Sequence, residues 1–250
     1  MAGTALRGRL TWRLARVAGT RPEAAGCTTL ALEVPDWLGH WPGQHVDVRL
    51  TVEDGYQAQR SYSIASALDG ELVELTVERI DDGEVSPYLV GELRPGDLLE
   101  LRGPVGGYFV WEPRLGGPLL LVSGGSGVVP LMAMLRQRAA AGSTVPARLL
   151  HSSRTYEDIL YREELQHLAA GDPDLRVTHT LTRARPPGWD GYARRIDAVM
   201  LAEVAWPPGD RPLAYVCGPT RLVEAVANAL VELGHDPGRV RTERFGPTGA

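Results

Sequence analysis

The sequence predicts a two-domain protein, with an antiparallel β-domain followed by an α/β domain built on a doubly wound parallel sheet. Short segments of alternating polar and apolar residues fill the chain as far as residue 111, whereas strand-like and helix-like segments alternate beyond it. Residues 1–112 hold 10 arginines and 17 acidic residues, a charge of −7, and residues 113–250 hold 16 and 14, a charge of +2. The stretch 112–118 is rich in proline and glycine, so we place the domains at 1–112 and 113–250.

The first domain is expected to consist of short antiparallel strands. It begins with a segment in which Leu10, Trp12 and Leu14 alternate with polar residues. This period of two favours a half-buried strand, although five arginines without an acid in residues 1–21 are also typical of a transit peptide. The spacing of the segments is typical of a small barrel or sandwich with one helical interruption. We expect the other strands at 28–34, 45–52, 60–66, 71–80 and 97–103, and the helix at 85–93.

The second domain is expected to alternate strands with helices, the pattern of a doubly wound parallel sheet. Its uncharged run between Arg114 and Arg136 is long enough to span a bilayer, but five glycines and two prolines interrupt it. We therefore interpret the run as a buried strand, a glycine turn and a helix start, and predict no membrane span. The expected strands are 119–123, 147–153, 177–182 and 212–218, and the expected helices 131–141, 159–169 and 222–234.

Composition excludes several classes of protein. Apolar residues make up 44% and charged residues 23%, values that argue against disorder, collagen and coiled coils. The net charge of −5 argues against a dedicated nucleic-acid binder, and the 26 basic residues are all arginines, which excludes mechanisms that need a lysine amine. Cys27 and Cys217 are too few for a disulfide framework or a four-thiolate cluster, and the six histidines are scattered, so we predict no metal. No segment points to export, so a cytoplasmic location is expected.

A glycine-rich turn between a predicted strand and a predicted helix is the first candidate site. Gly124, Gly125 and Gly127 would let backbone amides approach an anion, and Pro130 suits the first turn of the following helix. A pyrophosphate fits this position, although tight packing alone can also require glycine. The segment departs from the usual dinucleotide fingerprint, because its last position is proline and no acidic residue ends the second strand.

The second strand of this domain ends instead in Ser152, Ser153 and Arg154. Hydroxyls and a guanidinium suit the 2′-phosphate of NADPH better than the ribose 2′-hydroxyl of NADH. Arg183, which follows the third strand, is a second candidate for this phosphate. The pattern therefore favours NADPH over NADH, although solvated loop arginines are also common.

Two segments of the first domain together indicate a diphosphate site. Arg60, Tyr62 and Ser63 lie at the end of a predicted strand, and Arg60 and Tyr62 share one side of it. Ser86 is expected at a helix cap ahead of Pro87, where backbone amides would bind a phosphate. The first segment alone is equally consistent with an ordinary exposed strand.

Six short motifs follow one another along the chain, with a further one, ERFG, at 243–246. They are RSYS at 60–63, TVER at 76–79, GEVS at 83–86, GPVGGYF at 103–109, GGSGVVP at 124–130 and CGP at 217–219. Their order and spacing resemble those of the ferredoxin–NADP reductase family of flavoproteins over nearly the whole chain. The resemblance implies an FAD domain built as a six-stranded antiparallel barrel, followed by an NAD(P) domain.

The resemblance implies flavin contacts in the first domain. Arg60 and Ser86 would hold the FAD diphosphate. Tyr62 would pack on the isoalloxazine, and Ser63 would hydrogen-bond near flavin N5. Glu78 stands where many relatives have a basic residue, so only its backbone is given a role, at the pyrimidine edge. The implied cofactor-binding residues of this domain are Arg60, Ser61, Tyr62, Ser63, Thr76, Val77, Glu78, Gly83, Val85 and Ser86.

The resemblance implies nicotinamide contacts in the second domain. The Cys217 thiol would lie beside nicotinamide C4 and position it, although a buried cysteine also behaves as a small apolar residue. Phe245 would cover the flavin until nicotinamide enters, and Glu243 would assist proton movement. The implied catalytic residues are Ser63, Cys217, Glu243 and Phe245. The implied nucleotide-binding residues are Gly124, Gly125, Ser126, Gly127, Pro130, Ser152, Ser153, Arg154, Arg183, Cys217, Gly218 and Pro219.

The implied activity is hydride transfer from NAD(P)H to FAD, followed by release of single electrons to a separate acceptor protein. The acceptor is expected to be separate because two cysteines cannot hold a ferredoxin-type cluster. A ferredoxin, a cytochrome P450 system or an oxygenase component is the expected partner, and Arg9, Arg13 and Arg16 would dock an acidic carrier. Two alternatives stay open: a reductase of small acceptors such as free flavin, quinone or oxygen, and a non-catalytic flavin-binding subunit of a larger enzyme.

Overall fold

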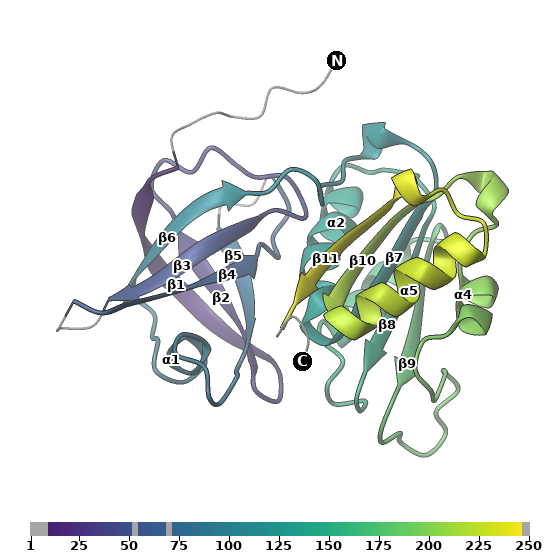
Figure 1. Ribbon diagram of the computed structural model, residues 1–250. Coiled ribbons are helices and arrows are strands. Elements are labelled where there is room, and N and C mark those ends of the chain that lie inside the picture. Colours follow the sequence, from purple (N-terminus) through teal and green to yellow (C-terminus); the bar gives the residue numbers. More distant parts are fainter. Residues whose placement is uncertain (1–9, 52–54, 69–71, 247–250) are drawn as a thin grey trace. The chain divides into compact units, whose positions relative to one another are not determined.

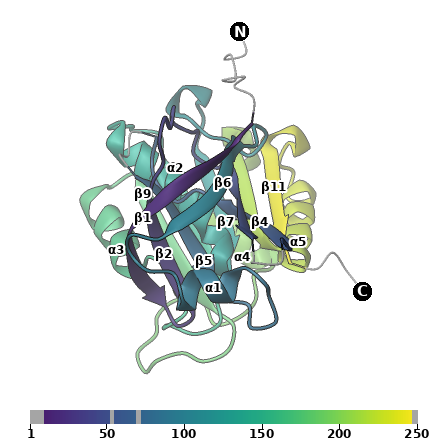
Figure 2. The same cartoon turned by 90° about the vertical axis from the view of Figure 1, so that its left-hand side faces the viewer.

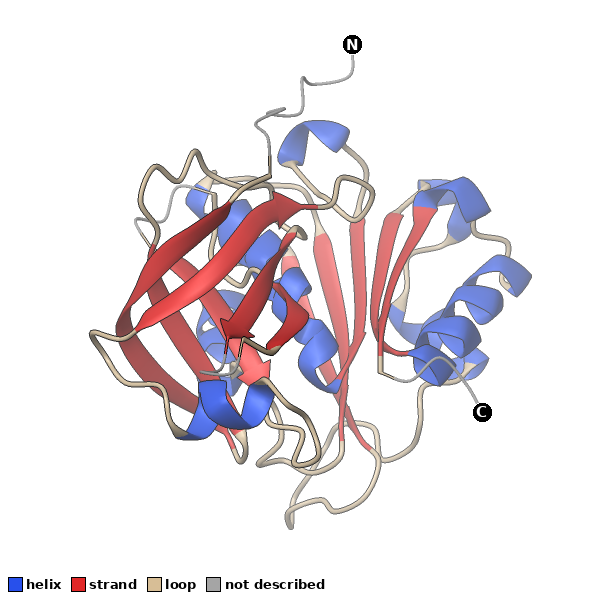
Figure 3. Cartoon of the chain, turned by 60° about the vertical axis from the view of Figure 1, so that its left-hand side comes forward, coloured by secondary structure: helices blue, strands red, loops and turns tan. Residues whose placement is uncertain are grey.

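The computed structural model describes residues 10–51, 55–68 and 72–246 (Figure 1). The chain divides into two compact units, one up to Val110 and the other from Trp111 onward. Each unit holds one sheet (Figure 3).

The first unit is a six-stranded antiparallel barrel, which confirms the predicted fold. Its strands lie in the order β4-β3-β6-β1-β2-β5. A bridge between Ile64 and Leu75 joins the chain just after β4 to β5, so the two outer strands of this order meet and the sheet closes. The strands are β1 (Trp12–Ala24), β2 (Cys27–Glu33), β3 (His45–Thr51), β4 (Gln57–Ser63), β5 (Val73–Glu78) and β6 (Leu98–Val105).

The barrel core follows from the alternation of side chains along the strands. In β1, Ala15 and Val17 are fully buried, whereas Leu14 and Arg16 are exposed. The helix α1 (Ser86–Gly91) lies at one end of the barrel (Figure 2) and contributes Leu89 to the same apolar core.

The second unit is a five-stranded parallel sheet with helices on both faces, again as predicted. The strand order is β11-β10-β7-β8-β9. Helices α4 and α5 pack on one face, and α2 lies on the other (Figure 1). The strands are β7 (Leu119–Gly124), β8 (Ala147–Ser153), β9 (Leu175–Leu181), β10 (Leu213–Pro219) and β11 (Val240–Phe245). The helices are α2 (Val128–Ala140), α3 (Arg162–Gly171), α4 (Ala198–Val204) and α5 (Thr220–Glu232), with 3-10 turns at Pro113–Leu115, Gly125–Gly127, Pro208–Asp210 and Pro237–Arg239.

The strand order places a topological switch point between β7 and β10. The chain leaves β7 toward β8 on one side of the sheet, and later returns to β10 on the other side. In doubly wound sheets, ligands bind beyond the carboxyl ends of the strands at this point. The glycine turn follows β7 directly, and the CGP motif ends β10.

Two elements of this unit are absent from the sequence prediction, namely β11 and α4. β11 is an edge strand with three charged residues, so it lacks the continuous apolar run of a central strand. α4 is only seven residues long. Among the described residues, no helix has the length and apolar character needed to cross a membrane.

Candidate functional site

The glycine turn packs directly against the end of β10. A side-chain carbon on Gly127 would lie 2.2 Å from the carbonyl oxygen of Cys217, and one on Gly124 would lie 2.6 Å from Leu222 Cδ1. Glycine is therefore required at Gly127, where the obstructing atoms are backbone, whereas the Leu222 side chain near Gly124 can move. Tight packing, the alternative explanation for these glycines, accounts for Gly127.

Gly125 has a different reason to be glycine. Its φ of +55° is left-handed, and no atom would obstruct a side chain there. Gly125 and Ser126 are half-exposed in the 3-10 turn, and α2 begins at Val128 with Pro130 in its first turn. The turn thus presents backbone at the start of a 13-residue helix, where the helix dipole favours an anion.

Arg154 and Arg183 are brought together at the carboxyl ends of β8 and β9. The backbone N–H of Arg183 donates to the carbonyl oxygen of Arg154 at 2.9 Å. Both side chains are exposed, and neither has a carboxylate partner within the part of the chain that the structure describes. Two exposed guanidiniums without a counter-charge, on backbone segments that are hydrogen-bonded to each other, suit a doubly charged phosphate.

Ser152 and Ser153, predicted beside Arg154, are both buried. The Ser153 hydroxyl lies 3.0 Å from Nε2 of the fully buried His151. Ser153 therefore faces the protein interior, and the accessible groups at this strand end are the arginines.

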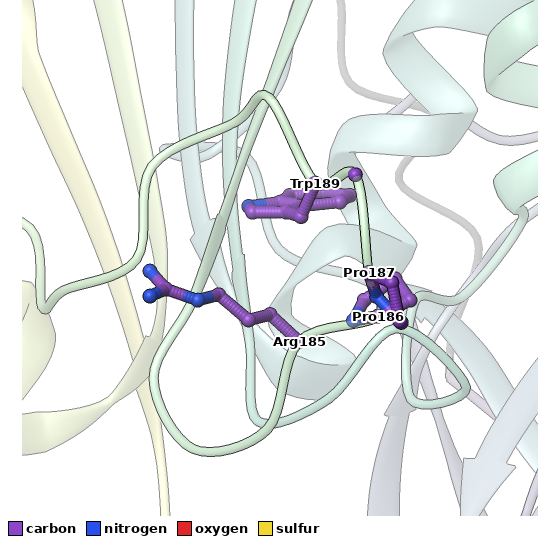
Figure 4. A pocket seen from close by; sticks show the side chains of 5 residues that line it. Arg185, Pro186, Pro187 and Trp189 are labelled. Atoms are coloured by element: carbon purple, nitrogen blue, oxygen red, sulfur yellow. The ribbon is translucent and has the colours of Figure 1, made fainter.

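A pocket of about 490 Å³ follows Arg183, and sequence reasoning missed it. Arg185, Pro186, Pro187, Gly188 and Trp189 line it (Figure 4). The Trp189 indole N–H donates to the carbonyl oxygen of Tyr192 at 3.0 Å, which holds the ring in the loop. The sequence signal was the Pro-Pro-Gly-Trp turn directly after the predicted phosphate arginine.

Arg60 lies on β4, where its guanidinium pairs with Glu84. Arg60 Nη2 donates to Glu84 Oε2 at 2.9 Å, and the two side chains are 53% and 47% exposed. A hydrogen bond from Tyr56, followed by the Arg60 contact, lowers the pKa of Glu84. Glu84 was not predicted as a site residue, although it lies within the GEVS motif.

Ser86 differs from the prediction in its role at α1. The N-cap residue is Val85, and Ser86 is the first residue of the helix. The Ser86 hydroxyl is buried and accepts a hydrogen bond from the backbone N–H of Ile80 at 3.0 Å, so it fixes the turn before the helix. A side-chain carbon on Gly83 would lie 3.0 Å from the carbonyl oxygen of Ile80, which explains the glycine of this tight turn.

The remaining predicted residues of β4 have distinct surroundings. Tyr62 is half-buried against the barrel core, and burial raises its pKa to about 12. Ser63 follows it as the half-buried last residue of the strand. The Ser61 hydroxyl donates to Asp47, which also binds Arg102, so Ser61 belongs to a network on the barrel wall.

The predicted residues of β5 lie at the edge of the sheet order. Thr76 and Val77 are buried and Glu78 is exposed. The Thr76 hydroxyl lies 2.7 Å from that of Thr29 on β2. β5 pairs with β2 along one edge, and on the other it meets the chain after β4 through the bridge at Leu75 and the hydrogen bond from Ala65 N–H to the Glu74 carbonyl oxygen.

Cys217 and Glu243 are brought together by the pairing of β10 with β11. They are register partners in the parallel ladder, as are Pro219 and Phe245. Burial, followed by the nearby Glu243 charge, raises the pKa of the Cys217 thiol well above its usual value. Burial raises the pKa of Glu243 to about 7. The thiol is therefore protonated at neutral pH, and the carboxyl exchanges a proton there.

The residues described above fit the two expected ligands. Those of the first unit fit FAD, and those of the second unit fit a nicotinamide dinucleotide. In the first unit, the accessible Arg60 guanidinium suits a diphosphate, and the half-buried Tyr62 ring suits an aromatic cofactor. In the second unit, the glycine turn and the two arginines suit the phosphates of a nicotinamide dinucleotide. The described residues contain no group of three or more potential metal ligands.

Two family models match the chain, one in each unit. Residues 25–110 match the oxidoreductase FAD-binding domain, and residues 121–228 match the oxidoreductase NAD-binding domain. Ferredoxin–NADP reductase B of Sorangium cellulosum is 37% identical over 238 residues, which cover 92% of this chain and 96% of that protein. The glycine betaine monooxygenase reductase subunit of Chromohalobacter salexigens is 35% identical over 84% of this chain, but the match spans only 57% of that protein.

Solved structures give the same result. The flavohem-like FAD/NAD-binding domain of nitric oxide dioxygenase from Vibrio cholerae superposes with a TM-score of 0.85 at 27% identity, covering 94% of this chain and 99% of that one. A cytochrome P450 reductase from Amycolatopsis superposes with a TM-score of 0.82 at 27% identity, covering 98% of this chain and 74% of that one.

Proposed function

Because this chain belongs to the ferredoxin–NADP reductase family and is an FAD-containing NAD(P)H oxidoreductase, we propose that it moves electrons from NADPH through FAD to a separate carrier protein. FAD, when bound, supplies the chemistry that links a two-electron donor to a one-electron acceptor. The observation that carries the choice of NADPH is the pair Arg154 and Arg183, which follow β8 and β9 at the same edge of the sheet as the glycine turn.

In the proposed nucleotide site, the dinucleotide lies across the carboxyl ends of the parallel strands. The turn Gly124–Gly127 and the start of α2 bind the pyrophosphate through backbone amides. Arg154 and Arg183 bind the 2′-phosphate, which only NADPH carries. Cys217, with Gly218 and Pro219, positions the nicotinamide through packing, because its protonated thiol is a poor nucleophile.

In the proposed flavin site, Arg60 binds the diphosphate, and Tyr62 covers the ring and excludes water. Ser63 hydrogen-bonds near N5, and the backbone of residues 76–78 binds the pyrimidine edge. Ser86 supports the phosphate turn, because its hydroxyl is bound to Ile80 and still has its own proton to donate. Glu243, which lies in the second unit, holds and releases a proton.

The proposed acceptor is a ferredoxin or the one-electron component of an oxygenase or P450 system. The support is the ferredoxin–NADP reductase that matches over nearly its full length, and the monooxygenase reductase subunit and P450 reductase among the relatives. The two cysteines of this sequence cannot ligate a four-thiolate cluster, which favours a separate carrier.

Of the three arginines predicted to dock an acidic carrier, Arg9, Arg13 and Arg16, we propose that Arg16 makes the main contact. The Arg13 guanidinium donates to the carbonyl oxygens of Pro35 and Asp36, which holds it on the barrel. Arg16 is more exposed and has only a long contact of 3.4 Å with Glu33. Arg9 lies outside the described residues.

The testing experiment is a visible spectrum of the purified protein, followed by anaerobic titration with NADPH and with NADH. Bleaching of a flavin band at lower NADPH than NADH concentration supports the proposal. Bound flavin that neither nucleotide bleaches supports a non-catalytic flavin subunit instead. Reduced protein is then mixed with a bacterial ferredoxin, free FMN or a quinone, and faster oxidation by the small acceptors than by ferredoxin would overturn the carrier assignment.

A further inference from the structure

His151 lies in a row of polar side chains that crosses the parallel sheet. Consecutive register pairs place Glu243, Cys217, Ser123, His151 and His179 side by side on the five strands. Register partners in a parallel sheet point to the same face. The apolar residues that alternate with this row pack against α4 and α5, so the row belongs to the opposite face.

Both ring nitrogens of His151 are hydrogen-bonded. Nδ1 lies 2.8 Å from the Ser123 hydroxyl, and Nε2 lies 3.0 Å from the Ser153 hydroxyl. Burial, followed by the neighbouring His179, lowers the pKa of His151 to about 3, so the ring is neutral at pH 7. One nitrogen of a neutral imidazole donates and the other accepts, and each serine hydroxyl can do either. The imidazole therefore joins β7 to β8 through two hydrogen bonds in a dry environment, where such bonds are strong.

The two serines occupy matching places in the proposed nucleotide site. Ser123 immediately precedes the turn Gly124–Gly127, and Ser153 immediately precedes Arg154. His151 thus connects the segment that faces the pyrophosphate with the arginine that faces the 2′-phosphate. The pyrophosphate and the 2′-phosphate are attached to the same adenosine. If Arg154 moves relative to the glycine turn, the protein can no longer bind both phosphates well at the same time.

We propose that His151 is a positioning residue that fixes Arg154 relative to the glycine turn and thereby sets the preference for NADPH over NADH. The proposal rests on the proposed function, because both segments act on the nucleotide only there. It assigns His151 no contact with the nucleotide.

The test measures binding to the FAD-loaded protein by calorimetry, with NADP⁺, NAD⁺ and adenosine 2′,5′-bisphosphate as ligands. His151→Phe keeps an aromatic ring of similar size and removes both hydrogen bonds. We expect it to raise the Kd of NADP⁺ about tenfold and that of NAD⁺ several-fold less, given the usual strength of buried hydrogen bonds. The matched control is His179→Phe, a second largely buried histidine of the row that bonds to neither serine.

Single serine variants separate the two ends of the connection. Ser153→Ala is expected to raise the Kd of NADP⁺ and of the bisphosphate about threefold and to leave that of NAD⁺ unchanged. Ser123→Ala is expected to weaken NAD⁺ as well, because both nucleotides carry the pyrophosphate, and to weaken NADP⁺ further, because it also releases His151 from the segment before the glycine turn. These variants remove one hydroxyl each and decide the matter if His151→Phe does not fold.

A double variant excludes direct contact of Ser153 with the phosphate. If Ser153 acts through His151, the NADP⁺ to NAD⁺ affinity ratio of His151→Phe/Ser153→Ala equals that of His151→Phe alone. Additive effects, an unchanged ratio in His151→Phe, or an equal change in His179→Phe would each overturn the proposal. Wild-type protein that binds neither nucleotide would instead overturn the proposed function.

Discussion

Cys217 and Glu243 lie side by side on β10 and β11, and the protein interior disfavours the charged form of both side chains. They are register partners of parallel strands. Burial raises the pKa of both groups, that of Glu243 to about 7. The pair therefore offers a neutral thiol that packs, next to a carboxyl that exchanges a proton near neutral pH, as suits positioning beside a hydride transfer.

The first prediction concerns Glu243 and stability. Its pKa of about 7 in the folded protein exceeds the ordinary value of 4.5. The folded state therefore binds a proton more tightly, and the stability from this group is full below pH 4.5 and falls as the pH rises to about 7. We expect Glu243→Gln to raise the free energy of unfolding at pH 8 by up to about 3 kcal/mol, with a gain that shrinks toward pH 5.

Urea unfolding at the two pH values measures this effect. Glu224→Gln, on the exposed face of α5, is the matched control and is expected to change the free energy of unfolding little at either pH. A Glu243→Gln gain that does not depend on pH would contradict the prediction.

The second prediction concerns Gly127. A methyl group there would lie 2.2 Å from the Cys217 carbonyl oxygen. Its nearest neighbours are backbone atoms of Cys217 and Gly218, so no flexible side chain can move aside to relieve the clash. We expect Gly127→Ala to lower the free energy of unfolding by at least about 2 kcal/mol and to weaken NADP⁺ and NAD⁺ alike. Gly171→Ala, in the same unit and with open space around the new carbon, is the control. Equal stability of the two variants in urea would show that the contact is not tight.

Local patterns were enough to predict most of the fold. The alternation along β1 and the apolar run of β7 depend on neighbouring residues only, so the sequence predicts both strands correctly. The face predicted for β1 was wrong, because Leu10 and Leu14 are exposed and Ala15 and Val17 fill the core. β11 was missed because its place is decided by pairing with β10, and an edge strand needs no apolar run. Glu243 was predicted through the ERFG motif, but its position beside Cys217 depends on this pairing.

The candidate site was predictable in part for the same reason. The glycine turn and the arginines after β8 and β9 follow from motif and strand order. The hydrogen bond from Ile80 N–H to the Ser86 hydroxyl, the pairing of Arg60 with Glu84 and the position of His151 between two serines arise from tertiary contacts. No local pattern encodes such contacts, because each partner is an ordinary polar residue in the sequence.

The third prediction concerns nucleotide preference. Arg154 and Arg183 are exposed and adjacent, so each is expected to make a charge-assisted contact with the 2′-phosphate. We expect Arg154→Ala and Arg183→Ala each to raise the Kd of NADP⁺ about tenfold, and that of NAD⁺ less than about twofold. Arg176→Ala, an exposed arginine near the amino end of β9, is the control. Calorimetric titration measures the dissociation constants. An equal rise in the Kd of NADP⁺ and of NAD⁺ would show that the two arginines do not bind the 2′-phosphate.

The fourth prediction concerns the ion pair of Arg60 with Glu84. The carboxylate holds the guanidinium at 2.9 Å, and it would also repel a diphosphate bound to the same arginine. We expect Arg60→Ala to weaken FAD binding by at least about tenfold, and Glu84→Gln to leave it unchanged or to strengthen it. Arg16→Ala, which breaks the exposed pair with Glu33 outside the flavin motifs, is the matched control for loss of a surface cation. Titration of flavin-free protein with FAD, followed by flavin fluorescence at two salt concentrations, measures the constants. Weaker binding in Glu84→Gln than in the wild type would mean that the carboxylate orients Arg60 for the diphosphate and does not compete with it.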